Sequence, residues 1–350
     1  MFYNDRVART PAKAGAGRAY MKDFFIADAA AHDNAVVTSY FVLSSIQLRD
    51  RKQGGKYLAL TLTDRTGLME GRMWDDFAES LQLCAEGSYV KAQGQISKYQ
   101  GKYQITLQKL RPAAASEVDS ADFVPTTTKN IDAMWTALRG YVESFHNADL
   151  KRLLNAFLDD QQIADAYRSA PAAKMLHHAW IGGLLEHVLA LVDVCNATAP
   201  FYPEVDRDLL LAGAILHDIG KTRELSWGTA FSYTTEGQLV GHISIAMGML
   251  REKIGEVSAA GGPFPDKLRV LLEHMILSHH GKYEFGSPKL PMTPEAILLS
   301  ALDDLEAKMQ NMRGEFARNV ANGRKGSEAT EWVRSMERQL LDSKTFLAEE

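Results

Sequence analysis

The chain has 350 residues, enough for two or three domains, and its 46% hydrophobic and 24% charged residues exclude collagen-like, coiled-coil and wholly disordered architectures. The net charge of −5 argues against a basic surface over the whole chain, but residues 35–112 carry 11 Lys and Arg against 7 Asp and Glu. A basic module joined to an acidic remainder is therefore expected.

The beginning of the chain and its cysteines indicate the compartment. Residues 1–22 are polar, small and basic, which predicts a flexible tail and not a signal peptide. No apolar run approaches the ~20 residues of a membrane-spanning helix. Cys84 and Cys195 lie far apart and match no disulfide or metal-binding spacing. We therefore expect a cytoplasmic location and no membrane partner.

Residues 23–111 predict a small β-barrel. Alternating or β-branched segments occur over residues 35–48, 57–63, 68–74, 88–97 and 102–110. A short helical pattern lies between the third and fourth of them, at residues 76–81. Five strands with a helix in that place are typical of the OB-fold, a Greek-key barrel that often binds single strands.

Aromatic and basic side chains alternate along these strands, as a surface that stacks bases and tracks phosphates requires. Since alternation sends some aromatic side chains inward, we expect Phe41 and Trp74 in the barrel core. The candidate nucleic-acid contacts are Tyr57, Tyr99, Tyr103, Lys56, Arg72, Lys98 and Lys102.

The remainder of the chain predicts a second, helical domain. Residues 112–129 are rich in Ala, Ser and Asp with Pro at both ends, which indicates a linker. Apolar residues then recur at helical spacing, which predicts an all-α domain over residues 130–313. We expect residues 314–350 to form a helical C-terminal extension, with an amphipathic helix over residues 328–346. The fold class is thus α+β with two domains.

The helical half holds nine of the ten histidines, and several of them interrupt apolar helix patterns. Imidazole and carboxylate groups are costly to bury unless they are paired or bind a metal. The candidate metal ligands, in chain order, are His187, His217, Asp218, His242, His279 and Asp303. Imidazole with carboxylate suits Mn²⁺, Fe²⁺, Co²⁺, Ni²⁺ or Zn²⁺, and the residue types alone do not choose among them.

The ligand set is large enough for two ions. Asp218 can bridge them, with His187, His217 and Asp303 on one ion and His242 and His279 on the other. Two ions clamp the attacking and leaving oxygens of a phosphoryl displacement. Further candidates, outside this set, have open roles. Lys221 either neutralises a phosphate or is a solvated helix-end lysine, His280 is a ligand or a phosphate donor, and His177 and His178 contact substrate or only pack.

The ordered set His187, His217-Asp218, His242, His279-His280 and Asp303 resembles the metal-dependent HD-domain phosphohydrolases. The flanking stretches GGLLEH (182–187), LHDIGK (216–221), SHHGKYEFGSP (278–288) and DDLEAK (303–308) resemble the YhaM-type 3′→5′ exoribonucleases, which also carry an OB-fold before the HD domain. Glu306 stands where that family pattern leads us to expect Asp, outside the ligand set.

The resemblance implies a two-metal 3′→5′ exoribonuclease, with Mn²⁺ as the expected ion and catalytic roles for Asp218, Lys221 and His280. The OB-fold would capture single-stranded RNA or DNA, and self-association of the chain is left open. A first alternative is a phosphohydrolase of a small nucleotide with a regulatory OB module. A second is a single-strand-binding protein without catalysis.

Overall fold

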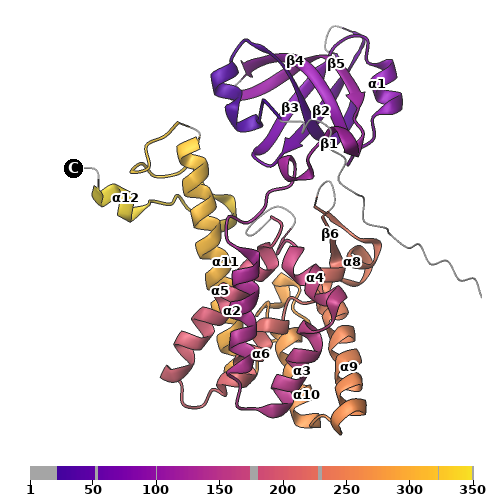
Figure 1. Ribbon diagram of the computed structural model, residues 1–350. Helices are drawn as coiled ribbons and strands as arrows, with labels where there is room; N and C mark the ends of the chain where they lie inside the picture. Colours follow the sequence, from indigo (N-terminus) through magenta and orange to yellow (C-terminus); the bar gives the residue numbers. More distant parts are fainter. Residues whose placement is uncertain are drawn as a thin grey trace, which may run out of the picture.

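The computed structural model describes residues 22–51, 54–99, 101–173, 180–227, 231–321 and 323–348. They form a five-stranded barrel and a separate helical unit, connected by a linker with short 3₁₀ turns (Figure 1). The α+β organisation expected from the sequence is confirmed. The predicted tail lies, apart from Lys22, outside the described residues.

The barrel closes in the strand order β1-β2-β3-β5-β4, and its one parallel pair is β3 with β5. This is the connectivity predicted for an OB-fold. Its elements are β1 (Val36–Asp50), β2 (Lys56–Asp64), β3 (Gly67–Met73), α1 (Ala78–Leu83), β4 (Tyr89–Tyr99) and β5 (Lys102–Pro112).

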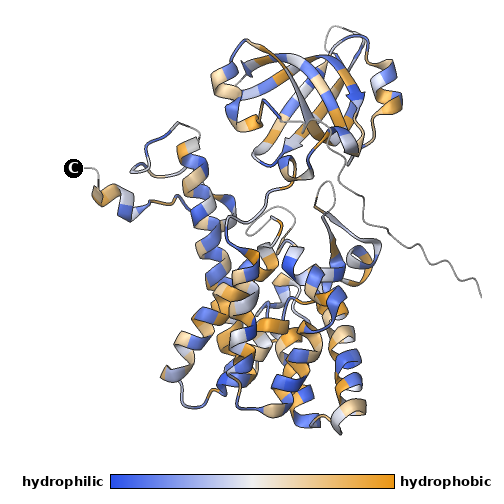
Figure 2. Ribbon diagram, viewed as in Figure 1, coloured by the Kyte–Doolittle hydropathy of each residue, from blue (hydrophilic) through white to orange (hydrophobic). Residues whose placement is uncertain are grey.

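Strand alternation fills the barrel. Leu58, Leu60 and Leu62 of β2 point inward and are buried, as is Phe41 of β1. Hydrophobic and hydrophilic residues accordingly alternate along the barrel ribbons (Figure 2). The strand β1 is long enough to pair with β4 through its first half and with β2 through its second. A bulge between Leu43 and Ser45 lets it turn the corner of the barrel.

The expectation that Trp74 belongs to the barrel core is wrong. Met73, the last residue of β3, points into the core, so alternation turns the next side chain outward. Trp74 is half-buried and stacks on Tyr57 of β2, with ring centroids 4.7 Å apart and an interplanar angle of 27°. Both rings therefore lie on the outer surface of the β2–β3 pair.

A buried ion pair ties the start of the described chain to the barrel. The ammonium of Lys22 lies 3.0 Å from the Asp64 carboxylate, and both side chains are fully buried. Lys22 also donates to the carbonyl of Tyr40 and lies 4.2 Å from the centroid of the Phe41 ring. Asp64 accepts in addition from the backbone N–H of Ile26. The pair of Lys22 and Asp64 thus links three segments, namely the start of the described chain, β1 at Tyr40 and the end of β2.

The helical unit follows the linker. Asn130, Asn147, Asp160 and Asp206 cap the N-termini of α2, α3, α4 and α6 with side-chain oxygens. The helices are α2 (Ile131–Glu143), α3 (Ala148–Leu158), α4 (Gln161–Ser169), α5 (Gly183–Thr198), α6 (Arg207–Leu216), α7 (Lys221–Glu224), α8 (Thr235–Val240), α9 (His242–Gly261), α10 (Asp266–Ser278), α11 (Pro294–Ala321) and α12 (Ser343–Ala348). The short strands β6 (Leu225–Ser226) and β7 (Ser232–Tyr233) form a hairpin before α8.

The core of this unit is built on α5 and α6, which pack against each other and against α11. By length and composition alone, Gly183–Phe201 could cross a membrane, although half of this window is buried inside the structure. Its apolar residues, including Leu184, Val188 and Leu191, belong to the largest hydrophobic cluster among the described residues. A core position therefore accounts for the composition of α5.

The C-terminal extension differs from the prediction. The helix α11 runs through the expected domain boundary at residue 313 to Ala321, and the predicted helix over residues 328–346 is wrong. The chain over residues 330–340 turns back on itself instead. The backbone N–H of Thr330 donates to the Leu340 carbonyl, and the N–H of Val333 donates to the Arg338 carbonyl. Only α12 remains helical at the end.

The buried pair of Lys22 and Asp64 generates a stability prediction. Asp64→Ala leaves an unpaired ammonium in the barrel interior, so it should destabilise the barrel by about 3–5 kcal/mol. The matched control is Asp75→Ala, because Asp75 pairs with Arg51 on the surface, where an ion pair contributes little. Urea unfolding followed by hydrogen exchange of barrel amides measures both. Equal stability of the two variants would contradict a stabilising role for the buried pair.

Candidate metal centre

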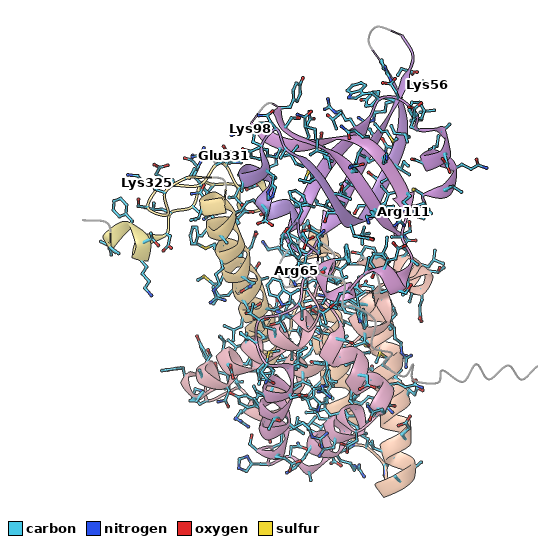
Figure 3. The ribbon with its side chains drawn as sticks, turned by 45° about the horizontal axis from the view of Figure 1, so that its top comes forward. Lys56, Arg65, Lys98, Arg111, Lys325 and Glu331 are labelled. Atoms are coloured by element: carbon cyan, nitrogen blue, oxygen red, sulfur yellow. The ribbon has the colours of Figure 1, made fainter. Side chains whose placement is uncertain are left out.

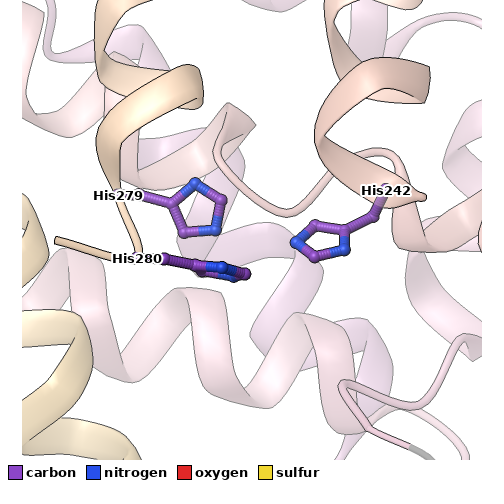
Figure 4. Close-up of side chains that lie close together, drawn as sticks. All are labelled: His242, His279 and His280. Atoms are coloured by element: carbon purple, nitrogen blue, oxygen red, sulfur yellow. The ribbon is translucent and has the colours of Figure 1, made fainter. Parts of the chain in front are cut away.

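Five helices bring the predicted ligands together at a cleft of about 390 Å³ in the helical unit, which all of them except the fully buried His217 line. The ligand-bearing positions are His187 on α5, His217 and Asp218 at the end of α6, His242 at the start of α9, His279 and His280 at the end of α10, and Asp303 on α11. Figure 4 shows the rings of His242 and His279 facing each other across this cleft, with His280 beside them. The candidate ligands selected from the sequence therefore lie close together in the structure.

One close backbone approach makes the cluster possible. At Gly220, between α6 and α7, an added Cβ would lie 2.0 Å from the carbonyl oxygen of His242. Only glycine fits there, and it allows the turn after Asp218 to rest directly on the first turn of α9. Asp218 and His242 are therefore held next to each other by main-chain packing.

The first group of donors surrounds Oδ2 of Asp218. The Nε2 atom of His217 lies 3.3 Å from this oxygen, and Nε2 of His187 lies 3.9 Å from it. The Asp303 Oδ1 atom completes the group, 3.2 Å from Nε2 of His187 and 3.8 Å from Nε2 of His217. Atoms at these separations can each make a bond of about 2.1 Å to one shared ion.

The second group surrounds the other oxygen of the same carboxylate. The Nε2 atoms of His242 and His279 lie 3.5 and 3.7 Å from Oδ1 of Asp218. The His280 ring joins them, since the three histidines have donor atoms within 4.8 Å of one another. Asp218 therefore presents one oxygen to each group, as a bridging ligand does.

Every imidazole is oriented by a partner behind it. The Nδ1 atoms of His217, His279 and His280 face the carbonyl oxygens of Ala214, Ile276 and Phe285, each at 2.8 Å. Because a carbonyl can only accept, each Nδ1 carries a hydrogen, and each ring is turned so that its Nε2 faces the other ligands. Rings fixed in this way are typical of metal ligands.

Carboxylates orient the remaining two rings. The Nδ1 atom of His187 lies 2.7 Å from Glu306, and Nδ1 of His242 lies 3.2 Å from Glu224. The contact of Glu306 with His187 was not predicted from the sequence, where Glu306 is only a residue outside the expected ligand set. The available signal was its position three residues after Asp303 on the same helix face. Nothing in the sequence around Glu224 pointed to His242.

Buried polar atoms without partners show that the donors fit a cation. Within the described part of the chain, Oδ1 of Asp218 and Nε2 of His242 and of His279 are fully buried and make no hydrogen bond. All three can act as acceptors, and burying acceptors together without a donor is unfavourable. A divalent ion resolves this arrangement, because it satisfies all three lone pairs at once.

The charges of the site compensate one another. Burial opposes ionisation of Asp218, but Lys221 and His217 outweigh it and hold the pKa of this carboxyl well below its usual range. Burial likewise lowers the pKa of His187, whereas hydrogen bonds to Asp303 and Glu306 raise it to about 10. Burial lowers the pKa of His279 and keeps its imidazole neutral.

Lys221 is an internal residue of the site and not a solvated lysine at a helix end. Its ammonium lies 2.6 Å from Oδ2 of Asp218, and its side chain is largely buried at the edge of the cleft. Burial lowers the pKa of Lys221, but attraction to Asp218 is stronger and raises it. The ammonium therefore stays charged. His177 and His178, the other candidate substrate contacts, lie outside the described residues.

The comparisons with known proteins agree with this geometry. Residues 184–308 match the HD domain family, and residues 42–113 match the OB-fold nucleic acid binding domain family. A 3′-5′ exoribonuclease YhaM of Halalkalibacterium halodurans is 34% identical, over 88% of this chain and 93% of that protein. This chain belongs to the YhaM 3′→5′ exoribonuclease family.

Other members of the YhaM family align over similar lengths. The protein of that name from Bacillus subtilis is 36% identical over 89% of this chain and 95% of its own length. The protein of that name from Geobacillus sp. is 35% identical over 86% of this chain and 90% of its own length. The alignments thus cover at least 90% of the length of each of these relatives. An HD domain implies dependence on a divalent metal, and the OB-fold indicates a single-stranded nucleic acid as substrate.

The barrel of this YhaM family member carries aromatic rings paired with cations. Arg51 lies 5.3 Å from the Trp74 ring, on the stack that Trp74 forms with Tyr57. Arg72 lies 5.3 Å from the ring of Tyr99, which is exposed. Tyr57, Arg72 and Tyr99 are among the contacts predicted from the sequence, whereas Trp74 was expected in the core.

The other predicted contacts lie near the strand ends. Tyr103 packs partly against the barrel core, with the ammonium of Lys98 5.5 Å from its ring centroid. Lys56 and Lys102 are exposed at the first residues of β2 and β5. In Figure 3, Lys56 lies at the end of the barrel that points away from the helical unit, and Arg65 lies near the junction.

The contact between His187 and Glu306 yields a prediction about metal affinity. Glu306→Ala should weaken Mn²⁺ binding by about 10–100-fold, because His187 loses the partner that orients its ring. Glu306→Gln, which keeps an acceptor oxygen, should lose less. Glu315→Ala, on the same helix but outside the cleft, is the matched control. Titration of the metal-free protein with Mn²⁺ measures the affinities, and an unchanged value for Glu306→Ala would contradict this role.

Proposed function

We propose that this chain removes nucleotides from the 3′ end of single-stranded RNA, at a centre that holds two Mn²⁺ ions. The observation that carries the proposal is the position of Asp218, whose two oxygens face two separate groups of donors. A carboxylate in that position bridges two ions. The names of the relatives supply the polarity and the RNA substrate.

Each ion has its own set of ligands in this proposal. His187, His217 and Asp303 hold the first ion, and His242, His279 and His280 hold the second, with Asp218 shared. His280 is assigned as a ligand because its ring is aimed into the cleft by the Phe285 carbonyl. Mixed imidazole and carboxylate donors suit Mn²⁺, and they also suit Fe²⁺, Co²⁺, Ni²⁺ or Zn²⁺.

The chemistry is hydrolysis of a phosphodiester. When bound, the two ions would polarise the phosphate and make a water nucleophilic near neutral pH. Lys221 is placed to neutralise charge on the phosphate, since its ammonium stays protonated at the edge of the cleft. Glu224 and Glu306 keep His242 and His187 in orientation through the reaction. Asp218 and Lys221 are the groups that we assign to catalysis.

The barrel is the proposed capture surface for the strand. The stacked pair of Tyr57 and Trp74, with Arg51 beside it, combines aromatic faces with positive charge. Tyr99 with Arg72 extends this surface, and Lys56, Lys98, Tyr103 and Lys102 lie around the strand ends. Bases stack on such rings whatever their sequence, so the surface suits RNA or DNA strands of any composition.

Two further parts of the proposal concern the whole protein. The C-terminal extension exposes Trp332, Phe346 and Leu347, which supports self-association of the chain through this segment. A cytoplasmic location is supported by the two cysteines. Both Cys84 and Cys195 are free and buried, as a reducing compartment allows.

Removing the bridging carboxylate tests the centre. Asp218→Ala should reduce the rate by about a hundredfold or more, because both ion sites lose their shared ligand. The assay follows 5′-labelled single-stranded RNA and DNA oligomers on gels with Mn²⁺, and the active protein should give ladders that shorten from the 3′ end. Asp266→Ala, at an exposed position at the start of α10, is the control.

A circular RNA of the same sequence completes this assay. An exonuclease should leave it intact, since it offers no end. Cleavage of the circle would indicate an endonuclease. No cleavage of linear RNA by protein shown to carry metal would exclude the proposed function.

The capture surface gives a separate prediction. Trp74→Ala should weaken binding of an RNA strand of about ten nucleotides by roughly tenfold, because one stacked base loses its platform. Cleavage of a dinucleotide, which is too short to reach the barrel, should not change. Leu68→Ala on β3, the strand that Trp74 directly follows, is exposed and aliphatic and is the control. Fluorescence anisotropy with labelled RNA measures the affinities. If Trp74→Ala bound the RNA with the affinity of the wild type, the stack of Tyr57 and Trp74 would not be part of the capture surface.

A further inference from the structure

Two aromatic side chains on the wall of the metal cleft are strongly exposed. Phe285 is 57% exposed and Tyr233 is 45% exposed, and both line the same cleft as the ligands. They come from separate elements, the 3₁₀ turn after α10 and the strand β7. An aromatic ring exposed to water does not gain the free energy that burial would give it. Its exposure at the edge of the metal cleft therefore suggests that a ligand covers it.

Phe285 is held rigidly in its exposed position. The 3₁₀ turn Tyr283–Phe285 closes with a hydrogen bond from the N–H of Phe285 to the Lys282 carbonyl, at 3.1 Å. The buried hydroxyl of Ser287, two residues after Phe285, donates to the carbonyl of Lys289 at 2.7 Å and lies 3.2 Å from the carbonyl of Leu277. The carbonyl of Phe285 itself orients His280. The backbone that carries the ring is thus fixed relative to the second group of metal ligands.

Tyr233 is anchored to the other side of that group. It pairs with Leu225 across the β6–β7 hairpin. Leu225 directly follows Glu224, and Glu224 orients the ring of His242. The N–H of Thr234 also donates to the Glu224 carbonyl, at 2.9 Å. In Figure 1 the strand β6 lies at the end of the helical unit nearest the barrel. The hairpin therefore lies on the side of the helical unit that faces the barrel.

The cation beside Phe285 adds a second element of recognition. The ammonium of Lys282 lies 5.3 Å from the centroid of the Phe285 ring, and both side chains are exposed. Aromatic faces with an adjacent cation are what proteins use to bind unpaired bases together with their phosphates. A base that is still paired in a duplex cannot offer its faces in this way.

We propose that Phe285 and Tyr233 form a clamp at the mouth of the metal cleft that stacks the terminal bases of the strand. The clamp selects unpaired 3′ ends and places the last phosphodiester over the ligands. It deepens the proposed function and rests on it. The substrate class is then a nucleotide with a base at its end, and a sugar phosphate alone binds weakly.

Binding of small ligands tests the clamp without turnover. With Mn²⁺ present, calorimetry compares 5′-AMP with ribose 5-phosphate, which shares the phosphate and the ribose but lacks the base. The wild-type protein should bind AMP about tenfold more tightly or better. Phe285→Ala should abolish this difference and leave ribose 5-phosphate unaffected, because only the side chain is removed and the carbonyl that orients His280 remains.

Tyr283→Ala is the matched control. Tyr283 lies in the same turn and is 62% exposed, but it does not line the cleft. This variant should bind AMP like the wild type. Equal affinity of the wild type for AMP and ribose 5-phosphate would overturn the clamp, and so would an equal loss in Phe285→Ala and Tyr283→Ala.

RNA degradation separates the clamp from the proposed function. On single-stranded RNA, Phe285→Ala should raise KM about tenfold with a smaller change in kcat, as the loss of a binding contact predicts. On an oligomer whose last two nucleotides are abasic, wild type and Phe285→Ala should behave alike. An equal loss on both substrates would show a structural effect through His280 and overturn the clamp. If the wild type degrades no RNA, the nuclease proposal fails, and the AMP comparison still decides whether the clamp binds bases.

Discussion

The catalytic half of the molecule depends on one buried negative charge, that of Asp218. Removing a carboxylate from water is costly, and only nearby positive charge and donors compensate for it. Here Lys221 and a ring of histidines from four other positions surround it. The apolar packing of α5, α6 and α11 fixes the helices that carry the ligands. Gly220 has no Cβ, and this lets the first turn of α9 lie against the turn that follows Asp218. The donors around Asp218 fit a shared divalent cation.

Two kinds of support hold the ligands, and they differ in origin. His217 and His279 each follow the last residue of a helix, and each ring is oriented by a carbonyl three residues earlier. Carbonyls at helix ends have no partner within the helix, so this support is local and comes with the helix itself. His187 and His242 depend instead on Glu306 and Glu224, which reach them only through tertiary packing.

This difference explains how much the sequence could predict. The ligands could be predicted because a polar residue that interrupts an apolar helix pattern can be recognised in the sequence itself. The strands could be predicted because the alternation of apolar and polar residues is a local pattern. The partners Glu224 and Phe285 lie at the ends of a four-residue helix and of a 3₁₀ turn, whose directions only the fold decides. Trp74 was misplaced by one step of alternation at a strand end. The helix expected near the C-terminus failed because Thr330 and Leu340 pair across a turn, which a helical pattern cannot reveal.

The separation of capture from cleavage has a physical consequence for an enzyme of this kind. A strand bound to the barrel through stacking and phosphate contacts keeps its free end at a high effective concentration near the metal cleft. The cleft itself then needs only weak affinity, enough to seat one end, and can release each product quickly. Rigid, exposed aromatic side chains at its mouth are compatible with that requirement. They bind a base without a deep pocket, so the same surface that positions the last nucleotide also lets it leave.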